Sequence, residues 1–273
     1  MSVRSFLSDV KYLIRKPVHV WKDRTEDRES LSLFSPLDSG LRFWSNGAGI
    51  IRHAGGETRE HIRYTNSLEA FEYSASLGCR AIETDLDITD SGEIILIHSE
   101  GGKGPSGNTL MDLEMLLGFM DEHPDMYIVT DCKNGTFGQI CETLGKLDRG
   151  YVSRFVIQLY RYGDFDIADR AGHFENYIFT LYDSGLYIWN SERIVKHCLR
   201  KGIGAVTMPA GFVRMNELEL YRRYGIRVYI HSAAGNEVNE PKEVLKFIKK
   251  GVYGFYSDEL TEKDLREIKE NHI

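Results

Sequence analysis

The sequence predicts an α/β fold, a TIM (β/α)8 barrel with a short extra β-hairpin strand after strand 2 and an N-terminal helical extension. Short β-branched runs alternate with longer helical patterns from residue 49 onward, which indicates a parallel sheet. Eight such units follow one another, which indicates that the sheet closes into a barrel. The length of 273 residues suits this fold, since α/β barrels typically take about 250.

The expected strands are short and mostly apolar, and the expected helices are longer and amphipathic. The strands are expected at 50–53, 81–87, 127–133, 155–159, 177–181, 205–209, 227–231 and 254–257. The helices are expected at 67–77, 110–121, 137–147, 165–171, 191–201, 216–224, 241–250 and 261–271. The extra strand is expected at 93–98, because the preceding Thr-Asp-Ser-Gly segment favours a tight reversal.

Residues 1–48 are expected to form an N-terminal amphipathic helix and a linker, ahead of a barrel domain at 49–273. Residues 3–16 have a helical period with an apolar stripe, which Pro17 ends. Residues 1–22 carry a net charge of +4, whereas the whole chain carries −7. The helix could therefore make a peripheral membrane contact through residues 3–16. Packing on the protein itself or on a second subunit is the alternative that we favour, and the oligomeric state stays open.

Composition narrows the classes of function. Hydrophobic residues make up 42% and charged residues 27%, as in ordinary globular proteins. The acidic balance argues against nucleic acid as a partner, because phosphate binding favours a basic face. The four cysteines have no zinc-like spacing, so we expect reduced thiols in a cytoplasmic protein, with the inner face of the membrane as a further location.

The main chemical signal is a set of acidic residues at the ends of neighbouring strands. In 81–87, Glu83, Asp85 and Asp87 share one face of the strand, and the partners on the other face must meet the helices. The carboxylates must then point into the barrel, where like charges are unfavourable unless something cancels them. A divalent cation would do so, and an all-oxygen site suits Ca²⁺, Mg²⁺ or Mn²⁺. Neutralisation by Arg or Lys is the alternative.

The next strand repeats the pattern. Asp131 and Lys133 share a face at the end of 127–133. A cation could take Asp131 while Lys133 binds phosphate oxygens. A simple salt bridge between strands would use the same two residues, so both interpretations stay open.

Two histidines also end expected strands. His53 is followed closely by Gly55 and Gly56, which let the backbone approach a ligand. His98 ends the extra strand. Imidazoles suit acid/base chemistry near neutral pH, and barrel enzymes place their sites at the carboxyl ends of the strands. Two histidines beside a carboxylate cluster therefore indicate a catalytic site.

Five short motifs occur in order between residues 50 and 98. They are His53-x-Gly55, then Asn66-Ser67-Leu68-Glu69-Ala70-Phe71, then Glu83-x-Asp85, then the turn Ser91-Gly92, then a strand ending in His98. This order resembles the glycerophosphodiester phosphodiesterase family, within the phospholipase-C-like phosphodiesterase superfamily, and the combination is far more specific than any one motif. Weaker matches continue at Asp131-x-Lys133, at Val156-Ile157-Gln158 and at 254–258.

Some positions depart from the family pattern. Ala54 stands where the family usually has Arg, Thr65 where it often has Glu, Ser99 where it often has Asp, and Asp131 where the third metal ligand is usually Glu. The His-Ala-Gly-Gly motif resembles a bacterial variant of the family.

The resemblance implies a role for each matching residue. His53 and His98 would be the acid/base pair, and Glu83, Asp85 and Asp131 would hold one divalent cation, Mg²⁺ or Ca²⁺. The phosphate and substrate contacts would be Lys133, Arg52 and Asn66. The arginine that the family has at position 54 contacts phosphate, so with Ala54 in its place this role would pass to Arg52, Lys133 or the metal.

The expected activity is metal-dependent hydrolysis of glycerophosphodiesters or related polyol and sugar phosphodiesters, with a place in lipid metabolism. One imidazole would deprotonate the attacking water or substrate hydroxyl, and the other would protonate the leaving alkoxide. Aromatic residues after the strands, Tyr160 and His231 among them, could line a pocket for the small-molecule substrate. The alternatives are a phospholipase C- or D-like enzyme on a membrane lipid or phosphate-linked glycan, and a non-catalytic phosphoester-binding protein.

Overall fold

The computed structural model of the chain describes residues 29–38, 44–98, 108–133, 135–181, 190–213, 215–231 and 239–272. The expected helix at 3–16, with the membrane contact predicted for it, lies outside the described residues. No helix in the described ranges has the length and apolar character needed to cross a membrane. The cytoplasmic location stays a prediction.

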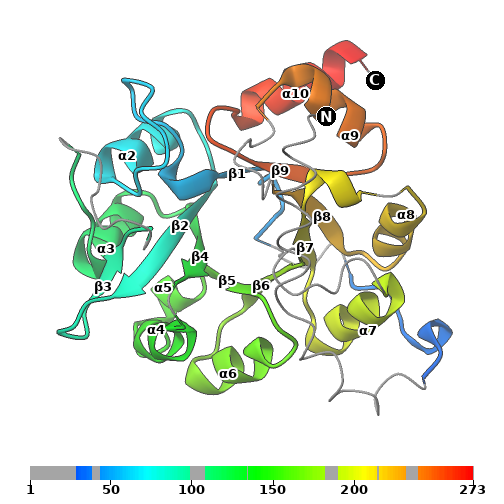
Figure 1. The fold of residues 1–273 in the computed structure, drawn as a ribbon, viewed down its shortest axis with the longest axis horizontal. Coiled ribbons are helices and arrows are strands. Elements are labelled where there is room, and N and C mark those ends of the chain that lie inside the picture. The colour runs from blue at the N-terminus through cyan, green and yellow to red at the C-terminus, as the bar shows by residue number, and fades with distance from the viewer. Residues whose placement is uncertain are drawn as a thin grey trace.

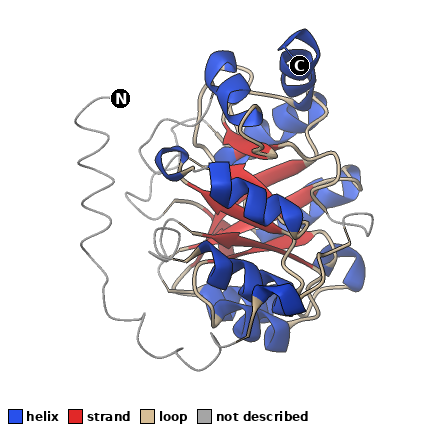
Figure 2. Cartoon of the chain, turned by 90° about the vertical axis from the view of Figure 1, so that its right-hand side faces the viewer, coloured by secondary structure: helices blue, strands red, loops and turns tan. Residues whose placement is uncertain are grey.

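Parallel strands close into a barrel with helices on its outside (Figures 1 and 2). Its strands are β1 (Ile50–Arg52), β2 (Ala81–Ile88), β4 (Tyr127–Cys132), β5 (Phe155–Leu159), β6 (Asn176–Thr180), β7 (Ala205–Met208), β8 (Arg227–Ile230) and β9 (Gly254–Ser257). Closure occurs at β1, which pairs in parallel with both β9 and β2, the latter through Arg52 and Ile82. The predicted TIM-barrel fold is confirmed.

The helices follow the strands along the chain. They are α2 (Leu68–Ser76), α3 (Leu113–Glu122), α4 (Phe137–Leu144), α5 (Arg149–Val152), α6 (Asp164–Ala171), α7 (Ser191–Lys201), α8 (Met215–Arg223), α9 (Pro241–Ile248) and α10 (Glu262–His272), with 3-10 turns η2 (Leu31–Leu33), η3 (His53–Gly55) and η4 (Ala210–Phe212). Helix α3 begins three residues later than predicted, because the Asp112 side chain accepts a hydrogen bond from the Met115 N–H at 2.9 Å and so caps the helix there.

The predicted hairpin is present as β3 (Ile94–Leu96), which pairs antiparallel with the end of β2. The Thr89 hydroxyl accepts from the Glu93 N–H at 3.1 Å, and Gly92 takes the positive φ of 88° that the reversal needs. After β3, the Ile97 N–H bonds to the Asp85 carbonyl at 3.0 Å. This contact brings His98 back to the mouth of the barrel.

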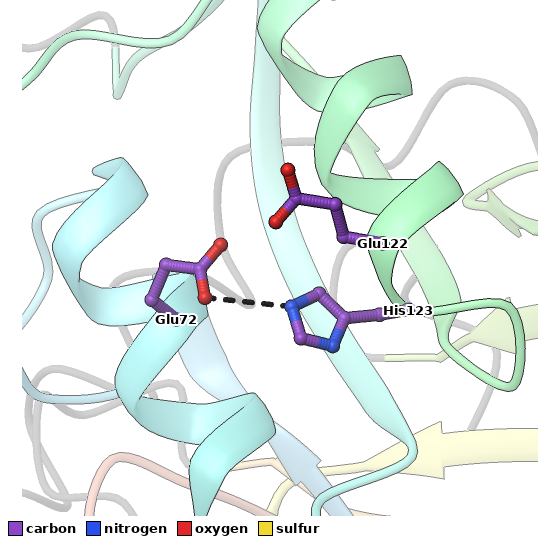
Figure 3. A group of neighbouring side chains, drawn as sticks. All are labelled: Glu72, Glu122 and His123. Atoms are coloured by element: carbon purple, nitrogen blue, oxygen red, sulfur yellow. Dashed lines mark hydrogen bonds and ion pairs between the residues drawn. The ribbon is translucent and has the colours of Figure 1, made fainter.

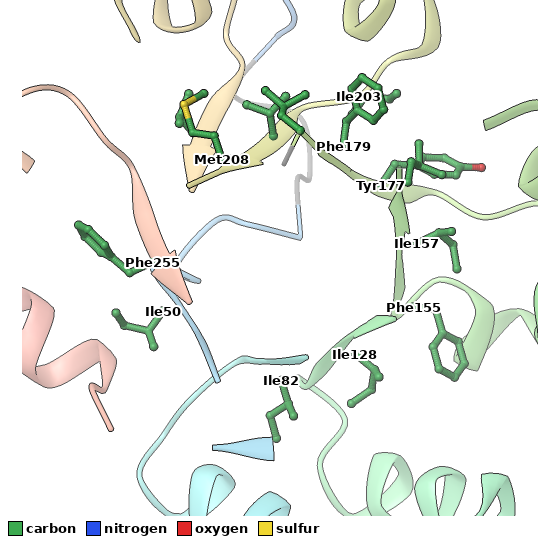
Figure 4. Packing of buried hydrophobic residues seen from close by; sticks show 14 of the residues in the cluster. Ile50, Ile82, Ile128, Phe155, Ile157, Tyr177, Phe179, Ile203, Met208 and Phe255 are labelled. Atoms are coloured by element: carbon green, nitrogen blue, oxygen red, sulfur yellow. The ribbon is translucent and has the colours of Figure 1, made fainter. Parts of the chain in front are cut away.

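The strands separate two apolar layers. One lies between strands and helices, where side chains such as Ile82, Ile128 and Phe155 point away from the barrel (Figure 4). The other fills the barrel interior and includes Ala81 and Val129. Successive residues of a strand point to opposite faces. A polar residue two or four positions from a member of this inner layer, in the same strand, therefore also points inward.

The amino-terminal end of the barrel is closed by residues 44–48. Trp44 is buried and stacks on Tyr229, with ring centroids 5.7 Å apart. The Tyr229 hydroxyl donates to the Ala48 carbonyl at 2.5 Å. Burial of a large aromatic side chain stabilises the fold by roughly 1.5–3 kcal/mol, so this end of the barrel contributes to stability.

Candidate active site

Three buried carboxylates meet inside the barrel near the carboxyl ends of β2 and β4. Since Ala81 and Val129 point inward, the alternation also turns Glu83, Asp85 and Asp131 inward. All three are buried, and they offer one carboxylate oxygen each within 4.8 Å of one another. The pairing of β2 with β4 places Asp85 directly opposite Asp131. The three acids predicted as ligands are thus brought together.

Lys133 partly neutralises this cluster. Its ammonium lies 2.7 Å from Asp85 Oδ1 and 2.6 Å from Asp131 Oδ2. The lysine alternative raised by the sequence is therefore partly realised. Among the described residues, Lys133 is the ammonium paired with these acids, so all three carboxylates in their ionised form would leave two excess negative charges. A buried all-oxygen donor set with that excess fits one hard divalent cation.

The pKa values of the cluster reflect the same excess of negative charge. Burial, followed by the neighbouring Asp85, raises the pKa of Glu83 to about 8. Burial also raises the pKa of Asp131, against the opposing effect of Lys133. Burial alone would lower the pKa of Lys133, but Asp131 and Asp85 outweigh it and raise the pKa overall. Within the described part of the chain, the three acids therefore face too little positive charge to balance them.

Two residues of the loop after β1 position two of the acids. The Ala54 N–H donates to Glu83 Oε2 at 2.7 Å, and Ala54 takes a left-handed φ of 48°. The Asn66 amide donates to Asp85 Oδ2 at 2.8 Å, while its oxygen accepts from the Thr84 hydroxyl and the Asp85 N–H. Asn66, predicted as a substrate contact, is thus bonded to Asp85.

Asp131 is held by a chain of hydrogen bonds that begins beside the neighbouring strand β5 and reaches β9. The Tyr160 hydroxyl donates to Asp131 Oδ1, and the Gln158 amide donates to the Tyr160 oxygen. The Tyr256 hydroxyl donates to Gln158 Oε1 at 2.9 Å. These bonds fix the orientation of the Asp131 carboxylate. Tyr160 was expected to line a substrate pocket, and in the structure it bonds to Asp131, a candidate metal ligand.

Both predicted histidines lie beside the cluster. His53 is only 7% exposed, and its Nδ1 lies 3.0 Å from Asp258 Oδ1. A proton held on Nδ1 by Asp258 leaves Nε2 able to accept one. The rings of His53 and His98 lie 5.0 Å and 5.2 Å from the ring of Tyr64. The two imidazoles therefore contact the same phenol ring.

Arg52 is not brought to this group. It precedes the inward His53 by one residue, so the alternation turns it outward to the helices. The guanidinium is fully buried and donates to the Ser74 hydroxyl at 3.0 Å and to the Leu260 carbonyl at 3.2 Å. It ties β1 to α2 and to the segment after β9. The phosphate contact expected of Arg52 therefore has no support in the geometry.

Two residues of the site were not singled out from the sequence. Asp258 follows β9, and the inward Tyr256 two positions earlier was the available signal that Asp258 also points inward. Tyr64 lies in the loop before α2. Neither the helical nor the strand periodicity of the sequence predicts side-chain directions in a loop.

A second group of candidate ligands lies on the outside of the barrel. This group lies between two helices (Figure 3) and consists of Glu72 from α2 and of Glu122 and His123 at the end of α3. His123 Nε2 lies 3.4 Å from Glu72 Oε2, and both glutamates are exposed. An exposed ion pair of this kind contributes little to stability, and it lies apart from the barrel mouth.

The chain was compared with protein-family models, with curated proteins and with solved structures. No protein-family model matches the chain, and no curated protein matches it in sequence. Solved structures do match. A glycerophosphoryl diester phosphodiesterase from Parabacteroides distasonis aligns with a TM-score of 0.63 and 16% identity, over 89% of this chain and 91% of that chain.

Two further structures are similar. A glycerophosphodiester phosphodiesterase, also from Parabacteroides distasonis, aligns with a TM-score of 0.63 and 14% identity, over 82% of this chain and 97% of that one. A phosphodiesterase from Oleispira antarctica, in complex with the product sn-glycerol-3-phosphate, aligns with a TM-score of 0.63 and 12% identity, over 81% and 96%. At such identities the likeness shows a shared fold.

Proposed function

We propose that the protein is a metal-dependent phosphodiesterase that acts on glycerophosphodiesters or related polyol and sugar phosphodiesters. The observation that carries the proposal is the convergence of Glu83, Asp85 and Asp131, which are buried beside two imidazoles. Among the described residues they are only partly balanced by positive charge. The fold shared with glycerophosphodiester phosphodiesterases supports the choice of reaction.

The three carboxylates would hold one divalent cation, Mg²⁺ or Ca²⁺. Such an ion supplies Lewis acidity toward a phosphoryl oxygen. Lys133 lies between Asp85 and Asp131, so its ammonium would bind a second non-bridging oxygen of the phosphodiester. Asn66 and Tyr160 would keep Asp85 and Asp131 in place while the substrate binds.

His53 would act as the general base. Its Nδ1 faces Asp258 at 3.0 Å, so the imidazolium that forms when Nε2 takes a proton is stabilised by a carboxylate. The proton comes from the attacking water or from a neighbouring substrate hydroxyl. His98 would act as the general acid, giving its proton to the alkoxide as the phosphorus–oxygen bond breaks.

Turnover of a substrate panel tests the proposal. The panel comprises glycerophosphodiesters, lysophospholipids and bis(p-nitrophenyl) phosphate, each assayed with Mg²⁺, with Ca²⁺ and with EDTA. We expect cleavage of glycerophosphodiesters with a cation and none in EDTA. Cleavage of lysophospholipids alone would indicate a phospholipase-type enzyme instead. Binding of these compounds without any turnover would identify a non-catalytic phosphoester-binding protein and contradict the proposal.

A further inference from the structure

Tyr64 occupies a special position between the two histidines of the site. Its ring is tilted by 50° to that of His53 and by 55° to that of His98, at centroid distances of 5.0 Å and 5.2 Å. Yet 41% of Tyr64 is exposed. A tyrosine that served only to fill the core would be buried against apolar neighbours. Tyr64 instead contacts both imidazoles and keeps a large surface open at the mouth of the barrel.

The backbone, and not core packing, holds the Tyr64 ring in this place. Tyr64 has a positive φ of 62°, and nearby His61 and Asn66 also have positive φ. Hydrogen bonds from the Thr58 N–H to the Ile62 carbonyl, at 2.8 Å, and from the Asn66 N–H to the Ala54 carbonyl, at 3.0 Å, fix the loop on both sides.

A bulky aromatic residue is unfavourable in that backbone region, whereas glycine would fit it freely. Such strain is found preferentially at functional sites. The loop therefore carries an aromatic side chain at a position where a glycine would adopt the same backbone conformation with less strain.

We propose that Tyr64 contacts the substrate and determines which alcohol portion of the phosphodiester the site accepts. This inference rests on the proposed phosphodiesterase function. The exposed face of the ring packs against the carbon–hydrogen face of a polyol or sugar bonded to the phosphorus, between the base His53 and the acid His98. The phosphoryl group itself lies toward the carboxylates and Lys133, away from this contact.

The phenol hydroxyl of Tyr64 is not needed for the proposed contact. Burial, followed by the carboxylates of Asp85 and Glu83, raises the pKa of Tyr64. The hydroxyl is therefore harder to ionise than that of an ordinary tyrosine. The aromatic face nevertheless carries the proposed selectivity, and a phenylalanine would retain it.

Calorimetric titration with two ligands that need no turnover tests this inference. The probes are sn-glycerol 3-phosphate and inorganic phosphate, which differ only in the alcohol portion, in the presence of Ca²⁺. For Tyr64→Ala we expect Kd for sn-glycerol 3-phosphate to rise about fivefold to tenfold, as loss of an aromatic contact implies. Kd for inorganic phosphate should change by less than about twofold. Tyr64→Phe should resemble the wild type with both probes.

Ile62→Ala is the matched control, because Ile62 lies in the same loop and is also 41% exposed. It should leave both dissociation constants unchanged. Steady-state kinetics on a glycerophosphodiester should show Tyr64→Ala raising KM with kcat largely kept.

Three results would overturn the role of Tyr64. The first is that Tyr64→Ala raises Kd equally for both probes. The second is that Ile62→Ala has the same effect as Tyr64→Ala. The third is that Tyr64→Ala changes Kd for neither probe. Failure of the proposed function is distinct, because it would appear as absent turnover while the calorimetric difference between the probes persists. A wild-type protein that binds neither probe would reject both.

Discussion

The two ends of the barrel are built from the same strands but have opposite chemistry. At the amino-terminal end, Trp44 and Tyr229 stack and fill the interior with apolar surface. At the carboxyl end, Glu83, Asp85 and Asp131 occupy the interior with charges that burial disfavours. The change occurs within β2, between Ala81 and Glu83. One end therefore contributes stability, whereas the other holds buried charges at a cost in stability.

Turnover should fall most strongly when either histidine at the carboxyl end is replaced. His53→Ala and His98→Ala should each lower kcat by about 10²–10⁴, the usual contribution of one acid/base group. Both variants should keep a melting temperature near that of the wild type, as measured by calorimetric scanning. His123→Ala is the matched control, since His123 is paired with Glu72 on the outside of the barrel. Wild-type turnover in both site variants would contradict the assignment.

The opposite end should respond in stability and not in turnover. Trp44→Ala should lower the free energy of unfolding by about 3–5 kcal/mol, because it leaves a cavity beside Tyr229. The kcat of the folded fraction should stay unchanged. Denaturant titration and steady-state kinetics on one preparation would measure both. A variant that kept its stability but lost turnover would show that the two ends are not separate in function.

A smaller effect is expected for Asp258→Asn. The amide cannot stabilise an imidazolium as the carboxylate does, so kcat should fall by about 10–100-fold, the range for residues that support a site group. Asp258 lies beside His53 at the carboxyl end. Its substitution should also shift the acidic limb of the pH–rate profile. A loss of stability with an unchanged pH profile would mean that Asp258 supports only the fold.

The pH dependence of stability should reveal the carboxyl end in metal-free protein. The pKa of Glu83 is raised from 4.5 to about 8, with burial as the largest cause. The folded protein therefore binds more protons than the unfolded chain between these values, and stability falls as pH rises through that window. Glu83→Gln should flatten this part of the profile in EDTA. An equal slope in wild type and variant would assign the effect to other groups.

Much of the fold and part of the site could be predicted from periodicity. The strands at 155–159 and 254–257 were predicted to the residue, because buried apolar runs are bounded by polar turns. The alternation along 81–87 also placed Glu83 and Asp85 inside the barrel. The same rule, applied to β1, would have turned Arg52 away from the site.

The rest depends on contacts that no local pattern encodes. Asp258 and His53 are 205 residues apart in sequence, and they meet because the last strand closes against the first. The place of Tyr64 depends on its left-handed backbone, which sequence periodicity does not predict for an aromatic residue.

Measurement of cation binding shows whether Glu83, Asp85 and Asp131 form a metal site inside the barrel. Calorimetric titration of the metal-free protein with Mg²⁺ and Ca²⁺ should show one bound cation, and Glu83→Gln or Asp131→Asn should abolish it. Glu72→Gln, in the outer cluster, should leave the affinity unchanged. A wild-type affinity retained by Glu83→Gln and Asp131→Asn, or lost only in Glu72→Gln, would contradict a cation site inside the barrel.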